Sequence, residues 1–308
     1  MLTVKKNKFI TTLDKYKFIY MMAIPSLAFT LVFSYLPFSG LVVAFKDYDI
    51  WKGFFDSPWA SRFGFAHFIE IFEQKAVTDS IKNTVTLSTL NLLIGFPAPI
   101  FLALLLNELR VRWFKKTVQT ISYIPNFLSW ISVIGLAMVF FSDYGPLNDI
   151  LSFVNPGRSR VLYLSKNHLF LPFQIILNLW KNMGFQSIIF LAAITGVDPQ
   201  LYEASSIDGA NRFRQVWHIT LPGIAPTISV MFILNIGSIL SSNFELVFGL
   251  QNAFINFETI DTAVYKYGLL QRGYSLATAL GLTRGLIALG LTVLANTITR
   301  RIDGATVF

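Results

Sequence analysis

The chain has 308 residues, of which 54% are hydrophobic and only 14% are charged. Soluble domains carry about 25% charged residues, so this composition argues against a soluble globular protein and indicates several membrane spans. The absence of cysteine excludes disulfides and thiolate metal sites. No Gly-x-x-x-x-Gly-Lys-Ser/Thr phosphate loop occurs, so we do not expect this chain to hydrolyse ATP itself.

Residues 1–17 form a basic segment in which lysines alternate with apolar side chains. This pattern fits a short interfacial helix on lipid headgroups, and it fits a disordered basic tail equally well. Residues 18–45 follow without a single charge. That stretch exceeds the apolar core of about 7–15 residues of a cleavable signal peptide, and no clear cleavage site follows it. Residues 18–46 are therefore predicted to be a retained first transmembrane helix, bent at Pro25 or Pro37.

Five further apolar stretches follow a polar, aromatic segment at 47–82 that is predicted to be an extracytoplasmic loop. They cover residues 83–107, 117–142, 169–194, 215–244 and 275–298. Each supplies the roughly 20 apolar residues that a bilayer core requires. The sequence thus predicts an all-α membrane protein with six transmembrane helices, a core of five helices over 83–298, and a cytoplasmic tail at 299–308.

The distribution of Lys and Arg predicts the orientation of these spans. With the N-terminus inside, the cytoplasmic segments hold 13 basic and 6 acidic residues, a net charge of +7. The outer loops hold 10 basic and 11 acidic residues, a net charge of −1. Both termini and the loop at 198–222 are therefore predicted to face the cytoplasm. The overall charge of +8 is explained by topology, and no nucleic-acid partner is expected.

The loop at 198–222 is a polar segment between two long apolar stretches. Asp198 can cap a helix that begins at Pro199, because proline has no N–H to leave unsatisfied there. A short helix is predicted up to residue 208, with a break at Gly209 and a second helical piece over 210–217. Pro222 is predicted to restart the chain into the next apolar stretch. Isolated helices shorter than about 12 residues are marginal in water, so this helix is expected to dock onto another surface.

Within this loop, six residues stand at a characteristic spacing: Glu203, Ala204, Gly209, Ile219, Leu221 and Pro222. On these residues, the loop resembles the cytoplasmic "EAA" loop of ABC-importer permeases. Segments at 107–125, 261–265 and 277–282 also resemble this family, so the resemblance covers roughly residues 80–298. The sequence of the loop looks like that of the carbohydrate-uptake branch, particularly permeases for oligo- and polysaccharides. Ser205 stands where the family usually has Ala, and Trp217 where it often has Phe.

The resemblance implies a type I ABC importer permease fold in which the loop is a coupling helix that sits in a groove of a separate ATPase subunit. Glu203 would contact the ATPase, Gly209 would supply the turn, and Pro222 would join the loop to its span. The expected coupling residues are Leu201, Tyr202, Glu203, Ala204, Ile207, Asp208, Gly209, Ala210, Leu221 and Pro222. Without the resemblance, the same periodicity also fits an amphipathic connector on the membrane surface.

The resemblance also implies the partners and the location. These are two ABC ATPase subunits that bind ATP and Mg, a second permease subunit, an extracytoplasmic solute-binding protein and a carbohydrate substrate, most specifically an oligosaccharide. The second permease is a paralogue in most such systems. The chain would lie in a bacterial cytoplasmic membrane and bind no cofactor of its own.

Polar side chains recur inside the fourth and fifth spans at helical spacing. They either join helices by hydrogen bonds or line a path for a hydroxylated solute. Charges at membrane depth are costly, so Lys181 and Arg284 are expected to face water, another helix or an acid. The candidate path residues are Gln174, Asn178, Lys181, Asn182, Gln186, Asn235, Ser238, Ser242 and Arg284.

Catalytic and metal sites have little support. None of the three histidines stands at metal-ligand spacing, and no serine lies in a Gly-x-Ser-x-Gly elbow. We therefore predict a non-catalytic transport subunit without a metal site. The alternative is a self-sufficient secondary transporter, which would be driven by an ion gradient and would not need nucleotide.

Overall fold

A computed structural model describes residues 8–302, and the chain is helical along most of that range, without a β-strand apart from an isolated bridge between Lys46 and Trp59. Five helical runs are long and apolar enough to cross a membrane, and a sixth candidate is a bent pair of helices. The prediction of an all-α membrane fold is confirmed. The five runs are Lys15–Phe45, Lys75–Glu108, Asn167–Thr195, Arg212–Gly237 and Tyr274–Arg300.

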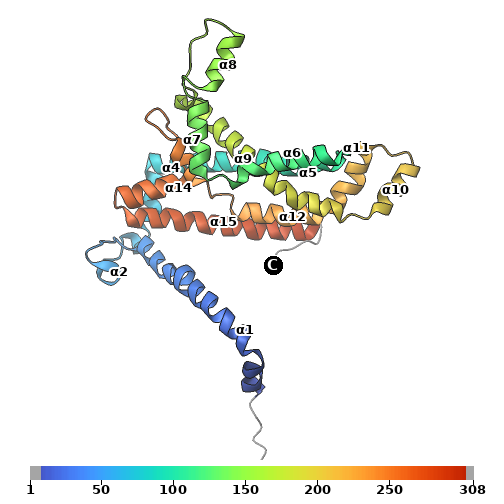
Figure 1. Cartoon of the computed structure of the whole chain (residues 1–308). Helices are drawn as coiled ribbons and strands as arrows, with labels where there is room; N and C mark the ends of the chain where they lie inside the picture. Colours follow the sequence, from blue (N-terminus) through green and yellow to red (C-terminus); the bar gives the residue numbers. More distant parts are fainter. Residues whose placement is uncertain (1–7, 303–308) are drawn as a thin grey trace, which may run out of the picture.

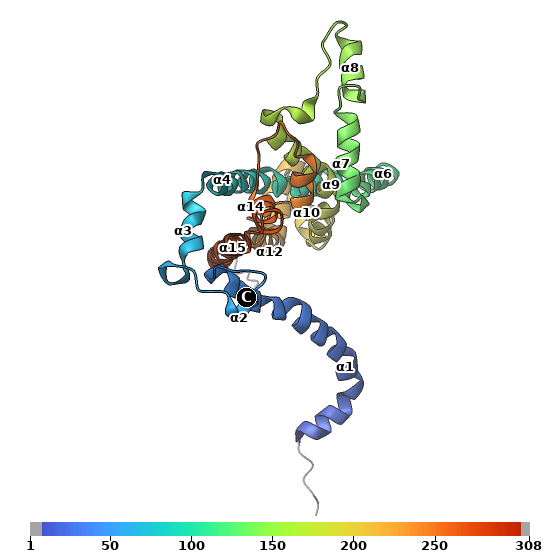
Figure 2. The ribbon, with the colours of Figure 1, turned by 90° about the vertical axis from the view of Figure 1, so that its left-hand side faces the viewer.

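The bundle is built from α4 (Lys75–Leu90), α5 (Pro97–Glu108), α9 (Asn167–Thr195), α12 (Leu221–Gly237) and α15 (Tyr274–Ile302). Figure 1 and Figure 2 both show α12 and α15 side by side. Apolar side chains from segments far apart in the sequence pack between these helices, for example Phe190 of α9 with Ile224 of α12. This packing fixes the relative positions of the helices that carry the polar residues discussed below.

The first helix extends away from the bundle (Figure 1, Figure 2). It runs as α1 (Lys8–Thr30) through a π-turn at Leu31–Tyr35 into a 3-10 segment at Leu36–Phe45. Pro25 lies inside α1, and Pro37 is the second residue of the 3-10 segment. The basic N-terminal segment is helical over its described part, 8–17, with a kink at Tyr16, whereas 1–7 lie outside the described residues.

The third predicted span, 117–142, is wrong as a single helix. The chain forms α6 (Arg112–Tyr123), a 3-10 turn at Ile124–Phe127 and α7 (Trp130–Phe140), and the two parts meet at 104°. Pro125 cannot donate a backbone hydrogen bond, and the Ser129 side chain accepts one from Ser132 N, which starts α7 as a new helix. Figure 1 shows α7 leading to α8 (Pro146–Val154), which stands away from the bundle.

The fifth span also differs from the prediction at both ends. Helix α11 (Arg212–Gln215) continues through a π-turn at Val216–Thr220 into α12, so Pro222 does not restart the chain. Pro222 is the second residue of α12 and directly follows the π-turn within this continuous helical run. Helix α12 ends at Gly237, so Ser242 is not on it, and the Asn243 side chain caps α13 (Phe244–Leu250) instead.

The connections that are predicted to be extracytoplasmic contain short helices. They are α2 (Gly53–Asp56), α3 (Ala66–Glu73) and α14 (Ile260–Tyr265), and α4 begins at Lys75, before the predicted start at residue 83. At the other end, α15 reaches Ile302, and the predicted tail beyond it, 303–308, lies outside the described residues.

Candidate functional site: the coupling loop and the polar cavity

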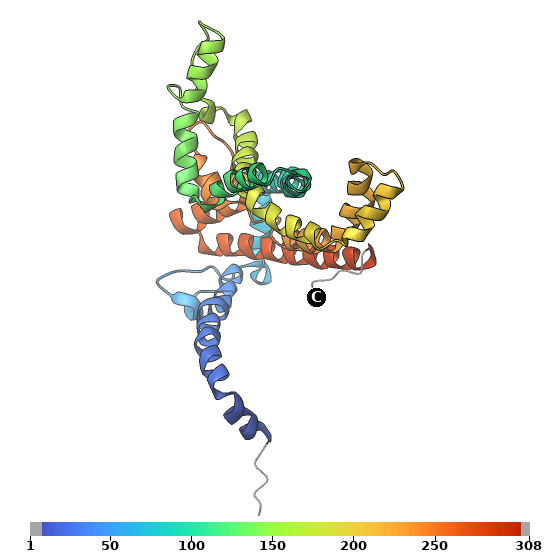
Figure 3. The same cartoon turned by 45° about the vertical axis from the view of Figure 1, so that its right-hand side comes forward.

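The loop at 198–222 folds largely as its sequence predicts. The Asp198 side chain accepts a hydrogen bond of 2.9 Å from Gln200 N and caps α10 (Pro199–Ile207), whose first residue is the predicted proline. Gly209 has φ +77°, a left-handed conformation that glycine adopts without steric cost. Figure 3 shows α10 at one end of the bundle, in the hairpin that connects α9 to α12.

A buried glutamine ties α10 to the start of the fifth span. Gln215 Nε2 donates to Ser205 Oγ at 3.0 Å and to Ser206 Oγ at 2.9 Å, and the Tyr202 hydroxyl lies 2.9 Å from Thr220 Oγ1. Ser205, the departure from the family alanine, therefore has a hydrogen-bonding role. Sequence reasoning missed Gln215, because only the folded hairpin brings it against α10. These bonds make α10, α11 and the π-turn one connected unit.

The outer face of α10 is not covered by any other part of the chain that the structure describes. Ile207 is 88% exposed and Leu201 is 52% exposed, with Glu203 and Ala204 also exposed between them. The remaining predicted coupling residues differ in their exposure. The side chain of Tyr202 is turned toward Thr220, and Leu221 packs in the cluster with Phe190 and Ile194. Ala210 is half-buried, whereas three residues are exposed: Asp208, Gly209 and Pro222. An apolar side chain flanked by polar groups on a short helix can bind a groove.

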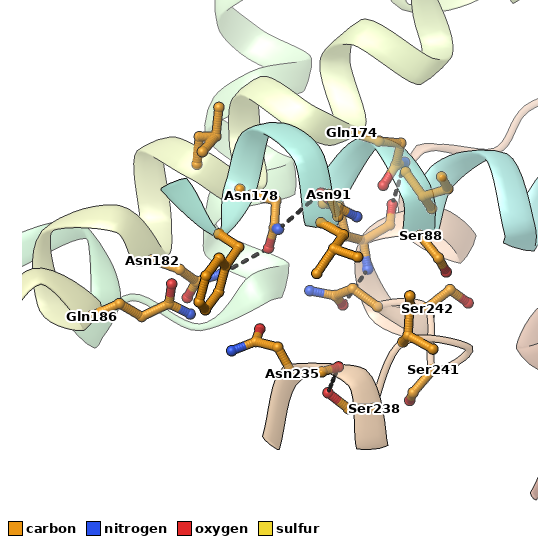
Figure 4. A pocket seen from close by; sticks show the side chains of 18 of the residues that line it. Ser88, Asn91, Gln174, Asn178, Asn182, Gln186, Asn235, Ser238, Ser241 and Ser242 are labelled. Carbon is orange, nitrogen blue, oxygen red and sulfur yellow. Dashed lines mark hydrogen bonds between the residues drawn. The ribbon is translucent and has the colours of Figure 1, made fainter. Parts of the chain in front are cut away.

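A polar cavity of about 180 Å³ lies between α4, α9 and α12 (Figure 4). Seven of the nine predicted path residues line it, although they come from different segments. The polar lining consists of Ser88, Asn91, Gln174, Asn178, Asn182, Gln186, Asn235, Ser238, Ser241, Ser242 and Asn243. The sequence analysis singled out neither Ser88 nor Asn91, although Ser80, Thr84, Ser88 and Asn91 stand at helical steps of four, four and three and could have indicated them.

Hydrogen bonds between side chains join the walls of the cavity, as the dashed lines in Figure 4 show. Asn182 Nδ2 donates to Asn178 Oδ1 at 2.7 Å, and Asn178 Nδ2 donates to Asn91 Oδ1 at 3.3 Å. Gln174, which is 2% exposed, donates to the carbonyl of Leu246 at 3.3 Å. The amides therefore connect helices and also face the cavity, so the two interpretations of the stripe are compatible.

The chemistry of this cavity is that of neutral donors and acceptors. None of its lining residues is charged. Asn and Gln both donate and accept hydrogen bonds, and serine hydroxyls do the same, which suits a hydroxylated solute. Within the described residues, no group of three or more His, Cys, Asp or Glu is placed to hold a metal ion.

The two predicted path residues that carry charge lie outside the cavity lining. Arg284 of α15 forms an ion pair with Asp261 of α14, and Asp261 Oδ2 also accepts from Ser242 Oγ at 2.7 Å. Lys181 is buried and donates to the backbone oxygen of Asn126 at 2.7 Å. Arg284 therefore has an acid partner, and Lys181 faces a neighbouring helix segment.

Comparisons with known proteins agree with this arrangement. Residues 95–306 match the family model "Binding-protein-dependent transport system inner membrane component". The chain is 43% identical over 300 residues to the polygalacturonan/rhamnogalacturonan transport system permease protein YteP of Bacillus subtilis (strain 168), across 96% of this chain and 92% of that protein. A crystal structure of a bacterial ABC transporter involved in the import of the acidic polysaccharide alginate superposes with a TM-score of 0.88 and 38% identity, over 96% of this chain and 100% of that one.

The family match covers more than half of the chain, and both similarities extend over nearly its whole length. They agree with the helical membrane architecture. The resemblance to ABC-importer permeases is confirmed: the chain belongs to the family of inner membrane components of binding-protein-dependent transport systems.

Proposed function

We propose that this chain is a permease subunit of an ATP-driven importer that moves an oligosaccharide across a bacterial cytoplasmic membrane. The observation that carries the proposal is the pairing of two features in one chain: an α10 face with exposed Ile207, and a cavity lined by uncharged hydrogen-bonding groups. The first suits a protein partner, and the second suits a sugar. The relatives named for transport of polygalacturonan and alginate support a carbohydrate as the substrate.

The ATPase partner follows from the coupling loop. We place α10 in a groove of a separate subunit that binds ATP and Mg, with Leu201, Ala204 and Ile207 as apolar contacts and Glu203 at the rim. An exposed ion pair from Glu203 contributes only about 0–1 kcal/mol, so shape and apolar burial dominate. Movement of α10 reaches α12 through Gln215 and Thr220, because α11, the π-turn and α12 form one helical run.

The further partners are a second permease subunit and an extracytoplasmic binding protein. One solved structure similar to this chain is the alginate transporter in complex with an alginate pentasaccharide-bound periplasmic protein; it is 38% identical, with a TM-score of 0.88 over 98% of this chain. The cavity of this chain is smaller than the 300–1,000 Å³ of ordinary ligand pockets. That size supports a path completed by a second permease. The distribution of Lys and Arg supports a cytoplasmic location of both termini and of α10.

The experiment that tests the function is reconstitution. The chain is purified with its co-expressed ATPases, second permease and binding protein, and uptake of labelled oligosaccharides into liposomes is measured with and without ATP. The proposal expects uptake only when ATP is present on the ATPase side. Uptake by the isolated chain under an ion gradient, without nucleotide, would instead support a secondary transporter.

A further inference from the structure

Lys181 is a buried cation in the middle of α9 with an unusual set of contacts. Its side chain is 6% exposed, and no ion pair between described residues includes it. The ammonium group donates to the backbone oxygen of Asn126 at 2.7 Å and lies 5.2 Å from the centre of the Trp130 ring. A charge at membrane depth is retained only where such contacts compensate it. The contacts with Asn126 and Trp130 therefore indicate which part of the structure the ammonium group stabilises.

Both contacts lie at the break between α6 and α7. Asn126 belongs to the 3-10 turn before the break, and Trp130 is the first residue of α7. A break of 104° leaves backbone carbonyls without helical partners, and Lys181 supplies a donor to one of them. One turn further along α9, a β-carbon at Gly184 would come within 1.9 Å of Ser122 O, so the two backbones meet beside Lys181.

A row of asparagines connects this break to the polar cavity. Asn126 Nδ2 donates to Asn182 Oδ1 at 3.2 Å. Asn182 donates to Asn178, and Asn178 donates to Asn91, which opens the π-turn Asn91–Gly95. Three of these four residues line the cavity. The orientation of the cavity amides is therefore coupled to the position of the α6–α7 break.

We propose that Lys181 is a positioning residue of the transport path: its ammonium holds the bend between α6 and α7 and, through Asn126, fixes the orientation of the cavity amides. The inference rests on the proposed transport function. It assigns Lys181 a role in shaping the path rather than in contacting the sugar. Its loss should release the bend and misalign Asn182 and Asn178.

The bend is measured directly by the distance between spin labels on the two helices. The chain has no cysteine, so single cysteines at the exposed positions Ile121 of α6 and Val139 of α7 can be labelled in the intact complex. Lys181→Met is expected to broaden or shift the distance distribution. Lys166→Met, the same change at an exposed position beside the start of α9, is the control and should leave it unchanged. An unchanged distribution in Lys181→Met overturns the proposal.

A second pair of variants covers the case in which Lys181→Met does not assemble. Trp130→Leu keeps the ammonium but removes the ring beneath it, and it is expected to shift the distribution in the same direction by a smaller amount. Lys181→Arg keeps the charge and is expected to preserve more of the bend than Lys181→Met. If Lys181→Met fails to assemble and Trp130→Leu has the wild-type distribution, the proposal is overturned.

The link from the bend to the cavity has its own test. Asn126→Leu keeps the backbone oxygen that Lys181 binds but removes the amide that donates to Asn182. We expect wild-type label distances, together with an increase of about ten-fold in the sugar concentration needed for half-maximal uptake. Unchanged half-saturation in both Asn126→Leu and Lys181→Met contradicts the inference, provided that the wild-type complex imports sugar with ATP. A wild-type complex that does not import would instead contradict the proposed function.

Discussion

The coupling loop and the polar cavity are stabilised in different ways. The loop is a local structure: its cap, its turn and its Gln215 hydrogen bonds all lie within residues 198–220. The cavity is assembled from α4, α9, α12 and the segment before α13, which are far apart in the sequence. The loop can therefore move as a unit, whereas the cavity depends on how the helices pack.

The largest effect on transport is expected from a substitution at Gly209, in the coupling loop. Gly209→Glu forces a side chain into a left-handed conformation, at roughly 1–2 kcal/mol, and projects a carboxylate into open space beside α10. We expect ATP-driven uptake to be abolished while the helices remain inserted, as judged by gel filtration of the purified chain. Gly209→Asn is the control, because asparagine tolerates this conformation, and most uptake should remain. Normal uptake by Gly209→Glu would refute the docking role.

On the cavity side, the largest effect on stability is expected at Gly184. Gly184→Ala places a β-carbon within 1.9 Å of Ser122 O, so α6 and α9 must separate. Overpacking of this kind destabilises by about 1–3 kcal/mol, and a lower thermal midpoint in detergent should reveal it. Gly290→Ala in α15 is the matched control, because nothing lies within 4 Å of its β-carbon. Equal midpoints for the two variants would contradict the close approach of α6 and α9.

Loss of the ion pair between Arg284 and Asp261 is expected to have a smaller effect on stability. Arg284→Met leaves the half-buried carboxylate of Asp261 without its cation, and we expect a loss of about 1–2 kcal/mol, less than for a fully buried pair. The double variant Asp261→Asn with Arg284→Met should lose less than the sum of the two single variants. Thermal midpoints of all four proteins measure this coupling, and strict additivity would show that the pair contributes nothing.

A change confined to the cavity wall separates transport from stability. Gln186 lines the cavity and is exposed there, so Gln186→Leu should raise the half-saturating sugar concentration about five-fold to ten-fold and leave the thermal midpoint near wild type. Ile189→Leu, on the exposed surface of the same helix, is the control. Unchanged half-saturation in Gln186→Leu would argue that α9 only joins helices.

The smallest effect on stability is expected from a substitution at Lys266, which lies outside the membrane spans. Its hydrogen bond with Glu258, at 2.5 Å, raises the pKa of Lys266 above the ordinary value, against an opposing effect of burial. A raised pKa stabilises the fold below the unfolded-state pKa of about 10.4 and is lost as the pH rises through the folded value. The thermal midpoint should therefore fall slightly more at strongly alkaline pH in the wild type than in Lys266→Met. Parallel pH curves would contradict this contribution.

The same difference between local and long-range structure explains what the sequence could predict. The cap at Asp198 and the turn at Gly209 depend on a few neighbouring residues, and both predictions are confirmed. The break before α7 has local signals in Pro125 and in the Ser129 cap, whereas the hydrogen bond that Asn126 accepts comes from a lysine 55 residues away and could not be predicted from neighbouring residues. Ser242 also lies near Asn235 in the cavity only because the chain leaves the helix after Gly237.

The polar residues at helical spacing in α9 do not all face the cavity, for the same reason. The four amides of α9 share one face because a single helix carries them, and all four line the cavity. Lys181 stands beside that stripe in the sequence, but its side chain turns toward the α6–α7 break. Helical spacing places side chains on a face, whereas the partner of a buried charge is decided by tertiary packing.

The central claim is that α10 faces the cytoplasm and is covered by an ATPase subunit. Ile207, 88% exposed in the chain alone, provides the direct measurement, because Ile207→Cys would be the only thiol in this chain. A membrane-impermeant maleimide should label it in inside-out vesicles that lack the ATPases, and assembly with the ATPases should protect it. Labelling from the outer side of the membrane, or equal labelling with and without the bound ATPases, would contradict the claim.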